Sequence, residues 1–497
     1  MSLVEKMKNP NRFRLCINGE WVDSVSGMTF PSDNPAKPRQ ILGVFQKGNR
    51  EDIAKAVEAA QAAFENWRET PAPKRGAILL KTAQLLRDNK ERLAREMTME
   101  MGKVLSEARG DVQEAIDITE YMAGEGRRLF GSTTPSELKK KFCMTVRLPV
   151  GVCGIITPWN FPIAIPAWKI MAALICGNTV VFKPSSDTPL CAVRLVETLV
   201  TAGIPRGVLN MVTGTGEEAG MSLVRHKEVR AVSFTGHRDT GAAILKEAGL
   251  KRVGLELGGK NGIIVMDDAD LQLALDGVIW GAFGTTGQRC TATSRVLVHE
   301  KIRSKFERIL INRMKKLKLG DGLESSTDVG PLINKAAQEK SARYVEIGER
   351  EGAKLCVGGK VLEQEGFFFE PTLFTDCSVE MRIAREEIFG PVLSLISVKD
   401  FDEAIDVINS VEYGLSSAIY TRDVKNAFEA INRIEAGLTY VNSSTIGSEV
   451  HLPFGGVKHT GIGTREGGIE GINEFSEIKT VYVDYSGKLQ RAQIDID

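Results

Sequence analysis

The stretch VGVCGIITPWNFPIAIPAWKIMAALICGNTVVFKPSSDTP (150–189) decides the fold of this chain. Two short β-rich apolar runs, VGVCGII (150–156) and NTVVFK (178–183), flank a helical run over 163–176. The same alternation continues through two more helical runs and two more strand-like runs, at 188–202, VLNMVT (208–213), 217–226 and AVSF (231–234). Strand, helix and strand at intervals of about 25 to 30 residues predict βαβ units, which require a parallel sheet.

Polar side chains follow the ends of these predicted strands. They are Thr157, Asn160, Lys183, Thr213 and Thr235. Doubly wound sheets bind ligands just beyond the carboxyl ends of their strands, so we expect a binding site at this edge.

The flanking regions predict a second lobe and two extensions. The first 130 residues read as largely helical after a strand-like opening over 16–22. A second α/β region has a helical run over 268–283 and strand-like runs at 261–266, 294–300, 391–398, 415–421 and 438–442. Two further segments, 128–148 and 479–485, are strand-prone, and exposed alternating strands usually pair in a larger assembly.

Composition narrows the class of protein. The chain has 497 residues, which at roughly 150 residues per domain favours about three domains. Its 64 Lys plus Arg balance 64 Asp plus Glu, which argues against a nucleic-acid partner or a polybasic membrane surface. The eight cysteines form no C-x-x-C pair, the five histidines show no metal-ligand spacing, and the charged N-terminus lacks the apolar core of a signal peptide. We therefore expect a cytoplasmic protein without a metal site.

Two residues are candidates for covalent chemistry. Cys290 lies in GQRCTATSR, a glycine-punctuated turn before a strand, where a strained and accessible nucleophile would be placed. Glu256 lies in GLELGGKNG, and a carboxyl group in apolar surroundings has a raised pKa and can act as a general base. On the residues alone, a lone cysteine such as Cys290 is more often a buried apolar side chain, and Glu256 is more often the partner of a salt bridge at a strand end.

A glycine-containing loop, FTGHRDTG, lies between a strand and a helix. Gly236 and Gly241 would let its backbone N–H groups approach a pyrophosphate, although the full G-x-G-x-x-G pattern is absent. Lys183 ends a strand of the same sheet, where it could reach ribose hydroxyls or phosphate, or simply be solvated.

Seven motifs together resemble the aldehyde dehydrogenase superfamily in order and approximate spacing. They are TPWNFP (157–162), KPSSDTP (183–189), FTG (234–236), LELGGKN (255–261), GQRC (287–290), EEIFGPV (386–392) and PFGGVKHTGIG (453–463). The resemblance covers nearly the whole chain. It implies an α/β fold with a Rossmann-like nucleotide-binding lobe (1–127 and 149–257), an α/β catalytic lobe (258–459) and a small β oligomerisation extension (128–148 and 473–497), as a homodimer or homotetramer.

The resemblance also implies catalytic roles. Cys290 corresponds to the nucleophile that attacks the aldehyde, and the Asn160 side-chain amide with the Cys290 backbone N–H to the oxyanion hole. Glu256 corresponds to the base that activates water for thioester hydrolysis. Lys183 and Glu387 correspond to the groups that hold the two riboses of the cofactor. The full implied cofactor-binding set is Thr157, Pro158, Trp159, Lys183, Ser185, Ser186, Gly214, Phe234, Thr235, Gly236, His237, Leu257, Glu387 and Phe389.

Two positions depart from the family pattern. His237 stands where relatives usually have a serine that contacts the pyrophosphate. Ser186 stands where NAD-preferring relatives often have a glutamate that repels a 2′-phosphate, so we expect NADP as cofactor, with NAD possible. Asp187 could restore part of that repulsion.

The residues implied to line the substrate tunnel are Glu114, Trp168, Arg289, Thr291 and Phe454. An arginine beside the nucleophile suits a substrate with a distant carboxylate, whereas Arg289 can equally form a structural salt bridge. The surrounding sequence is most similar to that of semialdehyde dehydrogenases acting on α-ketoglutarate semialdehyde (2,5-dioxovalerate). The alternatives are aminoadipate, succinate or pyrroline-carboxylate-type semialdehydes, glyceraldehyde, a broad-specificity enzyme, or a non-enzymatic structural role, against which the presence of nucleophile, base and oxyanion donor argues.

Overall fold

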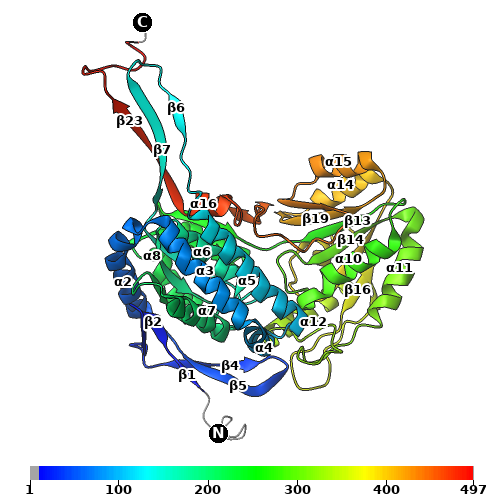
Figure 1. Cartoon of the computed structure of the whole chain (residues 1–497). Coiled ribbons are helices and arrows are strands. Elements are labelled where there is room, and N and C mark those ends of the chain that lie inside the picture. Colours follow the sequence, from blue (N-terminus) through cyan, green and yellow to red (C-terminus); the bar gives the residue numbers. More distant parts are fainter. Residues whose placement is uncertain (1–10, 496–497) are drawn as a thin grey trace.

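The computed structural model describes residues 11–495 and is built around two large sheets (Figure 1). The first sheet has eight strands in the order β22-β12-β11-β8-β9-β10-β2-β3. In that order their bounds are Gly461–Ile462, Arg252–Glu256, Val229–Thr235, Val152–Ile156, Thr179–Lys183, Leu209–Met211, Leu15–Ile17 and Glu20–Val22. The strands from β12 to β10 are parallel, which confirms the prediction from the alternating pattern.

The direction in which the sheet grows reverses at β8. The chain passes from β8 through β9 to β10 on one side, and then places β11 and β12 on the other side of β8. The loops that follow β8 and β11 therefore diverge and leave a crevice at the carboxyl ends of these strands. β9 ends at Lys183, β11 at Thr235 and β12 at Glu256, so several of the polar residues expected there do lie at this edge.

Helices cover both faces of this sheet. One face packs against α2 (Arg50–Glu69), α8 (Met221–Arg225) and α9 (Arg238–Ala248). The other face packs against α6 (Ala164–Ile175) and α7 (Pro189–Ala202), which α3 (Ala72–Asp88), α4 (Lys90–Met101) and α5 (Leu105–Glu125) cover in turn. The Asn49 side chain accepts from the backbone N–H of Asp52, whose carboxylate accepts from that of Asn49, so a capping box starts α2.

The second sheet has seven strands in the order β15-β16-β17-β14-β13-β19-β20 and forms the other lobe (Figure 1). In that order their bounds are Lys354–Val357, Thr372–Thr375, Val392–Val398, Thr293–His299, Asn261–Val265, Ser416–Tyr420 and Leu438–Val441. Apart from β15 the strands are parallel. The helices of this lobe are α10 (Leu271–Phe283), α11 (Glu300–Met314), α12 (Lys335–Arg350), α13 (Arg382–Arg385), α14 (Phe401–Asn409) and α15 (Val424–Arg433).

A three-stranded antiparallel arm projects from the first lobe (Figure 1). It consists of β23 (Ser476–Asp484), β7 (Lys141–Pro149) and β6 (Thr133–Pro135), in that order. Large apolar side chains are exposed on it, including Phe142, Ile478 and Tyr482. The two segments that the sequence identified as extensions therefore pair with each other. The short helix α16 (Glu470–Glu474) precedes β23 and packs on α6.

The N-terminal region contains more strand than its sequence pattern predicts. β1 (Arg12–Phe13), β5 (Lys37–Gln46) and β4 (Thr29–Asn34) form a separate sheet, so the expectation of a largely helical start is wrong for residues 12–46. The strand expected over 16–22 is a hairpin, because Asn18 and Gly19 both adopt positive φ. The first ten residues, on which the absence of a signal peptide rested, lie outside the described chain. None of the helices within residues 11–495 combines the length and apolar character needed to cross a bilayer.

Candidate active site

Cys290 lies in a tight loop between α10 and β14. Within the preceding turn (Gly284–Gly287), Thr285 has φ 52°, Thr286 φ 58° and Gly287 φ 68°. β-Branched residues rarely adopt this left-handed region, and each costs on the order of 1–3 kcal/mol unless its surroundings hold it. The prediction of a strained turn before the cysteine is thus confirmed for its backbone.

Glu107 on α5 holds this loop. Its carboxylate accepts hydrogen bonds from the Thr285 backbone N–H at 2.9 Å and from the Thr285 hydroxyl at 3.1 Å. The same carboxylate lies 3.5 Å from Nη2 of Arg289. One buried carboxylate from the first lobe therefore fixes the conformation of the loop that carries Cys290.

Two cavities meet at Cys290. The larger, with a volume of about 310 Å³, lies at the crevice between the β8 and β11 loops and extends to α12. The smaller, of about 110 Å³, lies on the other side of the thiol. Thr235, Leu257 and Cys290 line both. Burial, together with the nearby carboxyl groups of Glu256 and Glu387, raises the pKa of the Cys290 thiol to about 12, so the resting side chain is a protonated thiol.

Most of the implied cofactor-binding residues line the larger cavity. They are Pro158, Trp159, Thr235, Gly236, His237, Leu257, Glu387 and Phe389. The rings of Trp159 and Phe389 meet edge to face with centroids 5.5 Å apart. Glu387 Oε1 accepts from the Gly259 backbone N–H at 2.9 Å, and a side chain at Gly258 would collide with the Glu387 carboxylate. The paired glycines after Glu256 therefore allow the backbone that follows β12 to approach the Glu387 carboxylate closely.

The other implied cofactor-binding residues line neither of these cavities. They are Thr157, Lys183, Ser185, Ser186, Gly214 and Phe234. Lys183 is buried at the end of β9, where burial lowers its pKa to about 8. The Ser186 hydroxyl donates to the Gly214 carbonyl at 2.9 Å, which brings the KPSSDTP loop against the loop after β10. Asp187 is engaged on both oxygens, by Asn334 Nδ2 at 3.1 Å and by the Ser185 hydroxyl at 3.3 Å.

Asn160 and His237 occupy positions set by local hydrogen bonds. Asn160 Nδ2 donates to the Gln288 carbonyl at 3.1 Å, which places the amide beside the Cys290 loop. His237 caps α9, because its Nδ1 accepts from the Asp239 backbone N–H at 3.2 Å. This hydrogen bond favours the tautomer with the proton on Nε2.

All five implied substrate-tunnel residues line the smaller cavity, namely Glu114, Trp168, Arg289, Thr291 and Phe454. Trp168 and Phe454 pack edge to face at 5.8 Å. Arg289 lines the cavity and also forms an ion pair with Glu107, as one of the two interpretations from sequence had it, and its contact with a substrate carboxylate stays a prediction. Its guanidinium stacks 5.2 Å from the Phe161 ring centroid.

Two carboxyl groups in this cavity have raised pKa values. Burial raises the pKa of Glu114 to about 7, with opposing contributions from Arg289 and Lys103. Burial and the neighbouring Glu466 raise the pKa of Glu256 well above its usual range. Glu256 Oε2 has no hydrogen-bond partner within the described chain, so it remains available to a bound molecule.

Sequence reasoning missed several lining residues. Asn334, Ala337 and Lys340 border the larger cavity from the start of α12, and Glu466 borders the smaller one. Glu466 pairs with buried Lys169 on α6, which also donates to Ser233 Oγ at 2.9 Å. An Asn before a helical run was a readable signal for α12, since Asn334 caps it. A lysine within the apolar helix α6 carried no such signal.

Comparisons with known proteins identify the family. The profile of the aldehyde dehydrogenase family matches residues 21–481. The alpha-ketoglutaric semialdehyde dehydrogenase of Bacillus subtilis is 43% identical over 480 residues, covering 95% of this chain and 98% of that protein. The alpha-ketoglutarate semialdehyde dehydrogenase of Haloferax volcanii is 44% identical over 476 residues, covering 94% and 98%. A crystal structure of betaine aldehyde dehydrogenase from Staphylococcus aureus in complex with NAD+ has a TM-score of 0.94 at 37% identity, covering 98% of this chain and 97% of that one. These similarities confirm the predicted fold class, and the chain belongs to the aldehyde dehydrogenase family.

Proposed function

We propose that this protein oxidises a small acidic semialdehyde to the carboxylic acid with NADP or NAD, and that water is the final acceptor of the acyl group. The observation that carries the proposal is the position of Cys290 between two cavities, with Asn160 lining one and Glu256 lining the other. A nucleophile in this position can receive an aldehyde from one side and face a redox cofactor on the other.

The larger cavity fits a nicotinamide cofactor. It lies at the reversal point of a doubly wound sheet, where dinucleotides bind in such folds. Buried Lys183 and half-buried Glu387 would hold the two riboses, and Trp159 and Phe389 would border the nicotinamide end. When bound, the cofactor supplies one reaction, the acceptance of a hydride from the substrate carbon.

The first half of the proposed reaction forms a bond between Cys290 Sγ and the aldehyde carbon. The thiol gives up its proton to the ionised carboxylate of Glu256, which lines the same cavity and later releases it to solvent, and the carbonyl oxygen gains the electron pair of the broken C=O π bond. The Asn160 amide and the Cys290 backbone N–H would donate hydrogen bonds to that oxygen. Loss of a hydride from the same carbon leaves a thioester on Cys290.

The second half is hydrolysis of the thioester. In its ionised form, Glu256 takes a proton from water, whose oxygen attacks the thioester carbon, and the thiol leaves with a proton as the acid departs. The buried pair Lys169–Glu466 lies beside Glu256, where the ammonium of Lys169 favours the ionised form of Glu256 and the carboxylate of Glu466 opposes it. A relative that transfers the acyl group to coenzyme A would be expected to lack this base, so Glu256 supports water as acceptor.

The proposed substrate is α-ketoglutarate semialdehyde. Relatives with that activity in their names are 43% and 44% identical over nearly the whole chain. Within the smaller cavity Arg289 is a permanent cation, whereas Glu114 is about half protonated near pH 7. The local charge at and below neutral pH thus favours a substrate with a distant carboxylate. Aminoadipate, succinate and pyrroline-carboxylate-type semialdehydes, glyceraldehyde and broad specificity remain the alternatives.

We further propose that the arm mediates a homodimer or homotetramer, and that the protein acts in the cytoplasm. The arm presents exposed apolar side chains on β7 and β23, including Phe142 and Tyr482. The same proposal divides the chain into three domains. They are the nucleotide-binding domain (1–127 and 149–257), the catalytic domain (258–459) and the oligomerisation arm (128–148 and 473–497). Sedimentation of the full chain tests the assembly.

An aldehyde panel assayed with both cofactors tests the reaction. We expect the highest kcat/KM for acidic semialdehydes, with NADP used at least as well as NAD. Equal efficiency on butanal and on acidic semialdehydes would contradict the substrate class. The absence of any aldehyde oxidation would favour the non-enzymatic alternative.

A further inference from the structure

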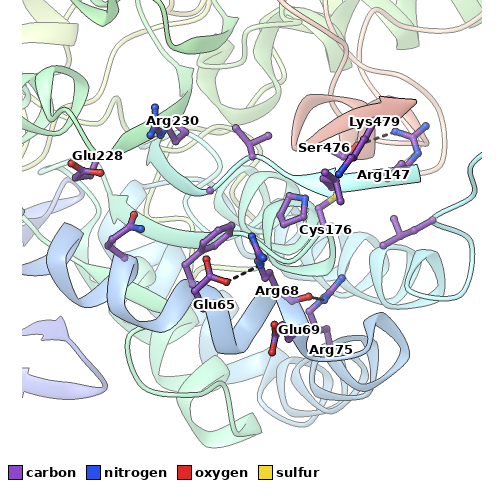
Figure 2. Close-up of a pocket in the computed structure, with 17 residues that line it drawn as sticks. Glu65, Arg68, Glu69, Arg75, Arg147, Cys176, Glu228, Arg230, Ser476 and Lys479 are labelled. Atoms are coloured by element: carbon purple, nitrogen blue, oxygen red, sulfur yellow. Dashed lines mark hydrogen bonds and ion pairs between the residues drawn. The ribbon is translucent and has the colours of Figure 1, made fainter. Parts of the chain in front are cut away.

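A third cavity, polar and of about 660 Å³, lies at the root of the arm (Figure 2). Gly151, just before β8, and Arg230 at the start of β11 line it, so it lies at the opposite ends of the strands whose carboxyl ends form the active site. α2 forms another wall, and β7 and β23 of the arm close it. We call it the root cavity.

Cationic side chains outnumber carboxylates in the root cavity. The cations are Arg68, Arg75, Arg147, Arg230 and Lys479, and the carboxylates are Glu65, Glu69 and Glu228 (Figure 2). The chain as a whole has a formal net charge of zero. A local excess of positive charge in a concave surface therefore distinguishes this region and attracts anions.

Three of these cations already have side-chain or carbonyl partners. Arg68 pairs with Glu65 at 2.9 Å, and Arg147 donates to the Ser476 hydroxyl at 2.9 Å. The guanidinium of Arg75 donates hydrogen bonds only to backbone carbonyl oxygens. Within residues 11–495, Arg230 and Lys479 have no ion pair and no side-chain hydrogen bond, and they enter from two different elements, β11 and β23.

Arg75 is the buried cation of the set. It is 5% exposed, and its guanidinium donates from Nε to the Ile175 carbonyl at 3.0 Å and from Nη1 to the carbonyls of Arg68 and Thr70. Within the described chain no carboxylate pairs with it, and its Nη2 has no acceptor. Burial of a cation without a counter-ion is unfavourable. An anion bound beside Arg75 would therefore lower the free-energy cost of burying its guanidinium group.

We infer that the root cavity binds a small organic anion that carries phosphate or carboxylate groups. Guanidinium groups present paired N–H donors that match the oxygens of either group. The volume lies in the range of small-molecule sites and exceeds that needed for one inorganic ion. Phe64, Leu129 and Pro149 give the cavity an apolar wall for the body of the ligand.

The ligand would join the arm to the sheet. Arg230 belongs to a strand of the first lobe and Lys479 to the arm, so an anion held by both links the two. An anion that binds the folded protein but not the unfolded chain raises thermal stability by mass action. This inference is independent of the proposed substrate and reaction.

Calorimetric titration of the full-length protein, saturated with NADP so that the cofactor site is filled, tests the site. The probes are ribose 5-phosphate and citrate, with sodium chloride at matched ionic strength as reference. We expect one of the two probes to bind and to raise Tm by about 2–4 °C. Binding by ribose 5-phosphate alone identifies phosphate as the recognised group, and binding by citrate alone identifies carboxylate.

Charge reversal locates the site. Arg230→Glu and Lys479→Glu should each weaken binding roughly tenfold or more, because each removes a charge-assisted contact. Arg206→Glu is the matched control, since Arg206 is an exposed arginine that pairs with Glu20 outside the cavity. Aldehyde oxidation without anion should stay unchanged in all three variants, which shows that they fold. Failure of both probes to bind, or equal weakening by Arg206→Glu, would overturn the inference.

Discussion

The two cavities that meet at Cys290 differ in what forms their walls. Backbone conformation sets much of the wall of the larger cavity, as in the strand-end loop at Gly236 and the close approach at Gly258. Ionisable side chains shape the smaller cavity, where Glu114, Glu256 and Arg289 lie within one small volume. Backbone geometry is the same at any pH, whereas the charge of the smaller cavity depends on protonation. We therefore expect substitutions in the larger cavity to change cofactor affinity, and those in the smaller one to change selectivity and pH dependence.

Cys290 lines both cavities, so its replacement should give the largest difference between the two functions, catalysis and cofactor binding. Cys290→Ala should abolish aldehyde oxidation, because no acyl group can form, while the bound cofactor loses only one wall atom. Fluorescence titration with NADPH should give a Kd close to that of the wild type. Mass spectrometry of the wild type trapped during turnover should find the acyl group on the peptide containing Cys290. Label on another cysteine would contradict the assignment.

Glu256 tests the part of the smaller cavity that faces the thioester. Glu256→Gln should slow hydrolysis about 10²- to 10⁴-fold, the usual contribution of a general base, and leave acyl-enzyme to accumulate. Stopped-flow absorbance should show a burst of NADPH followed by a slow steady state.

The wild-type enzyme adds a pH test of the same residue. Burial and Glu466 raise the pKa of Glu256, so its ionised fraction grows with pH, and the hydrolysis rate should rise through the neutral and alkaline range. Glu256→Gln should lose this rise. An unchanged turnover in that variant would assign the base to another group.

Ser186 lies outside the larger cavity and tests the position proposed for the adenosine ribose of the cofactor. Ser186→Glu places a carboxylate beside the expected 2′-phosphate site, and like charges at such a distance cost several kcal/mol. The ratio of kcat/KM for NADP to that for NAD should fall by about a hundredfold or more. Ser186→Gln, of similar size and without charge, is the control. A wild-type enzyme with a strong preference for NAD would already contradict the expectation.

Arg289 tests whether the smaller cavity selects by charge. Loss of one charge-assisted bond costs about 1.5–3 kcal/mol, so Arg289→Ala should lose roughly ten- to over a hundredfold in kcat/KM for acidic semialdehydes. Butanal should be affected far less.

The ion pair of Arg289 requires a second variant. Glu107→Gln breaks that pair and loosens the loop of Cys290, but leaves the guanidinium at the cavity wall. It should lower kcat for every aldehyde to a similar extent and keep the preference for acidic ones. If both variants act on all aldehydes alike, Arg289 is a positioning residue only.

The contrast between backbone pattern and side-chain environment also explains which features could be predicted from the sequence. The strands and their polar ends were predictable because a parallel sheet has a strong local pattern and a fixed ligand edge. The motifs also placed Cys290, Asn160 and Glu256 around one point. The Glu107 contact with Thr285 could not be predicted, because it joins residues 178 positions apart. Likewise, the ionisation of Glu114 depends on burial by distant segments, which no local pattern encodes.

Substitution of Glu114 should have the smallest effect on substrate selectivity. This effect on KM should appear only when pH is varied. Burial raises the pKa of Glu114 to about 7, so the carboxyl group is neutral below that pH and becomes an anion above it. The anion would repel the carboxylate of an acidic semialdehyde, and KM for that substrate should therefore rise severalfold as pH passes from about 6 to 8. Glu114→Gln keeps the shape and removes the charge, so its KM should stay nearly flat over the same range, while KM for butanal should be flat in both proteins. A KM that rises equally in the variant would show that another group, and not Glu114, sets the charge of the smaller cavity.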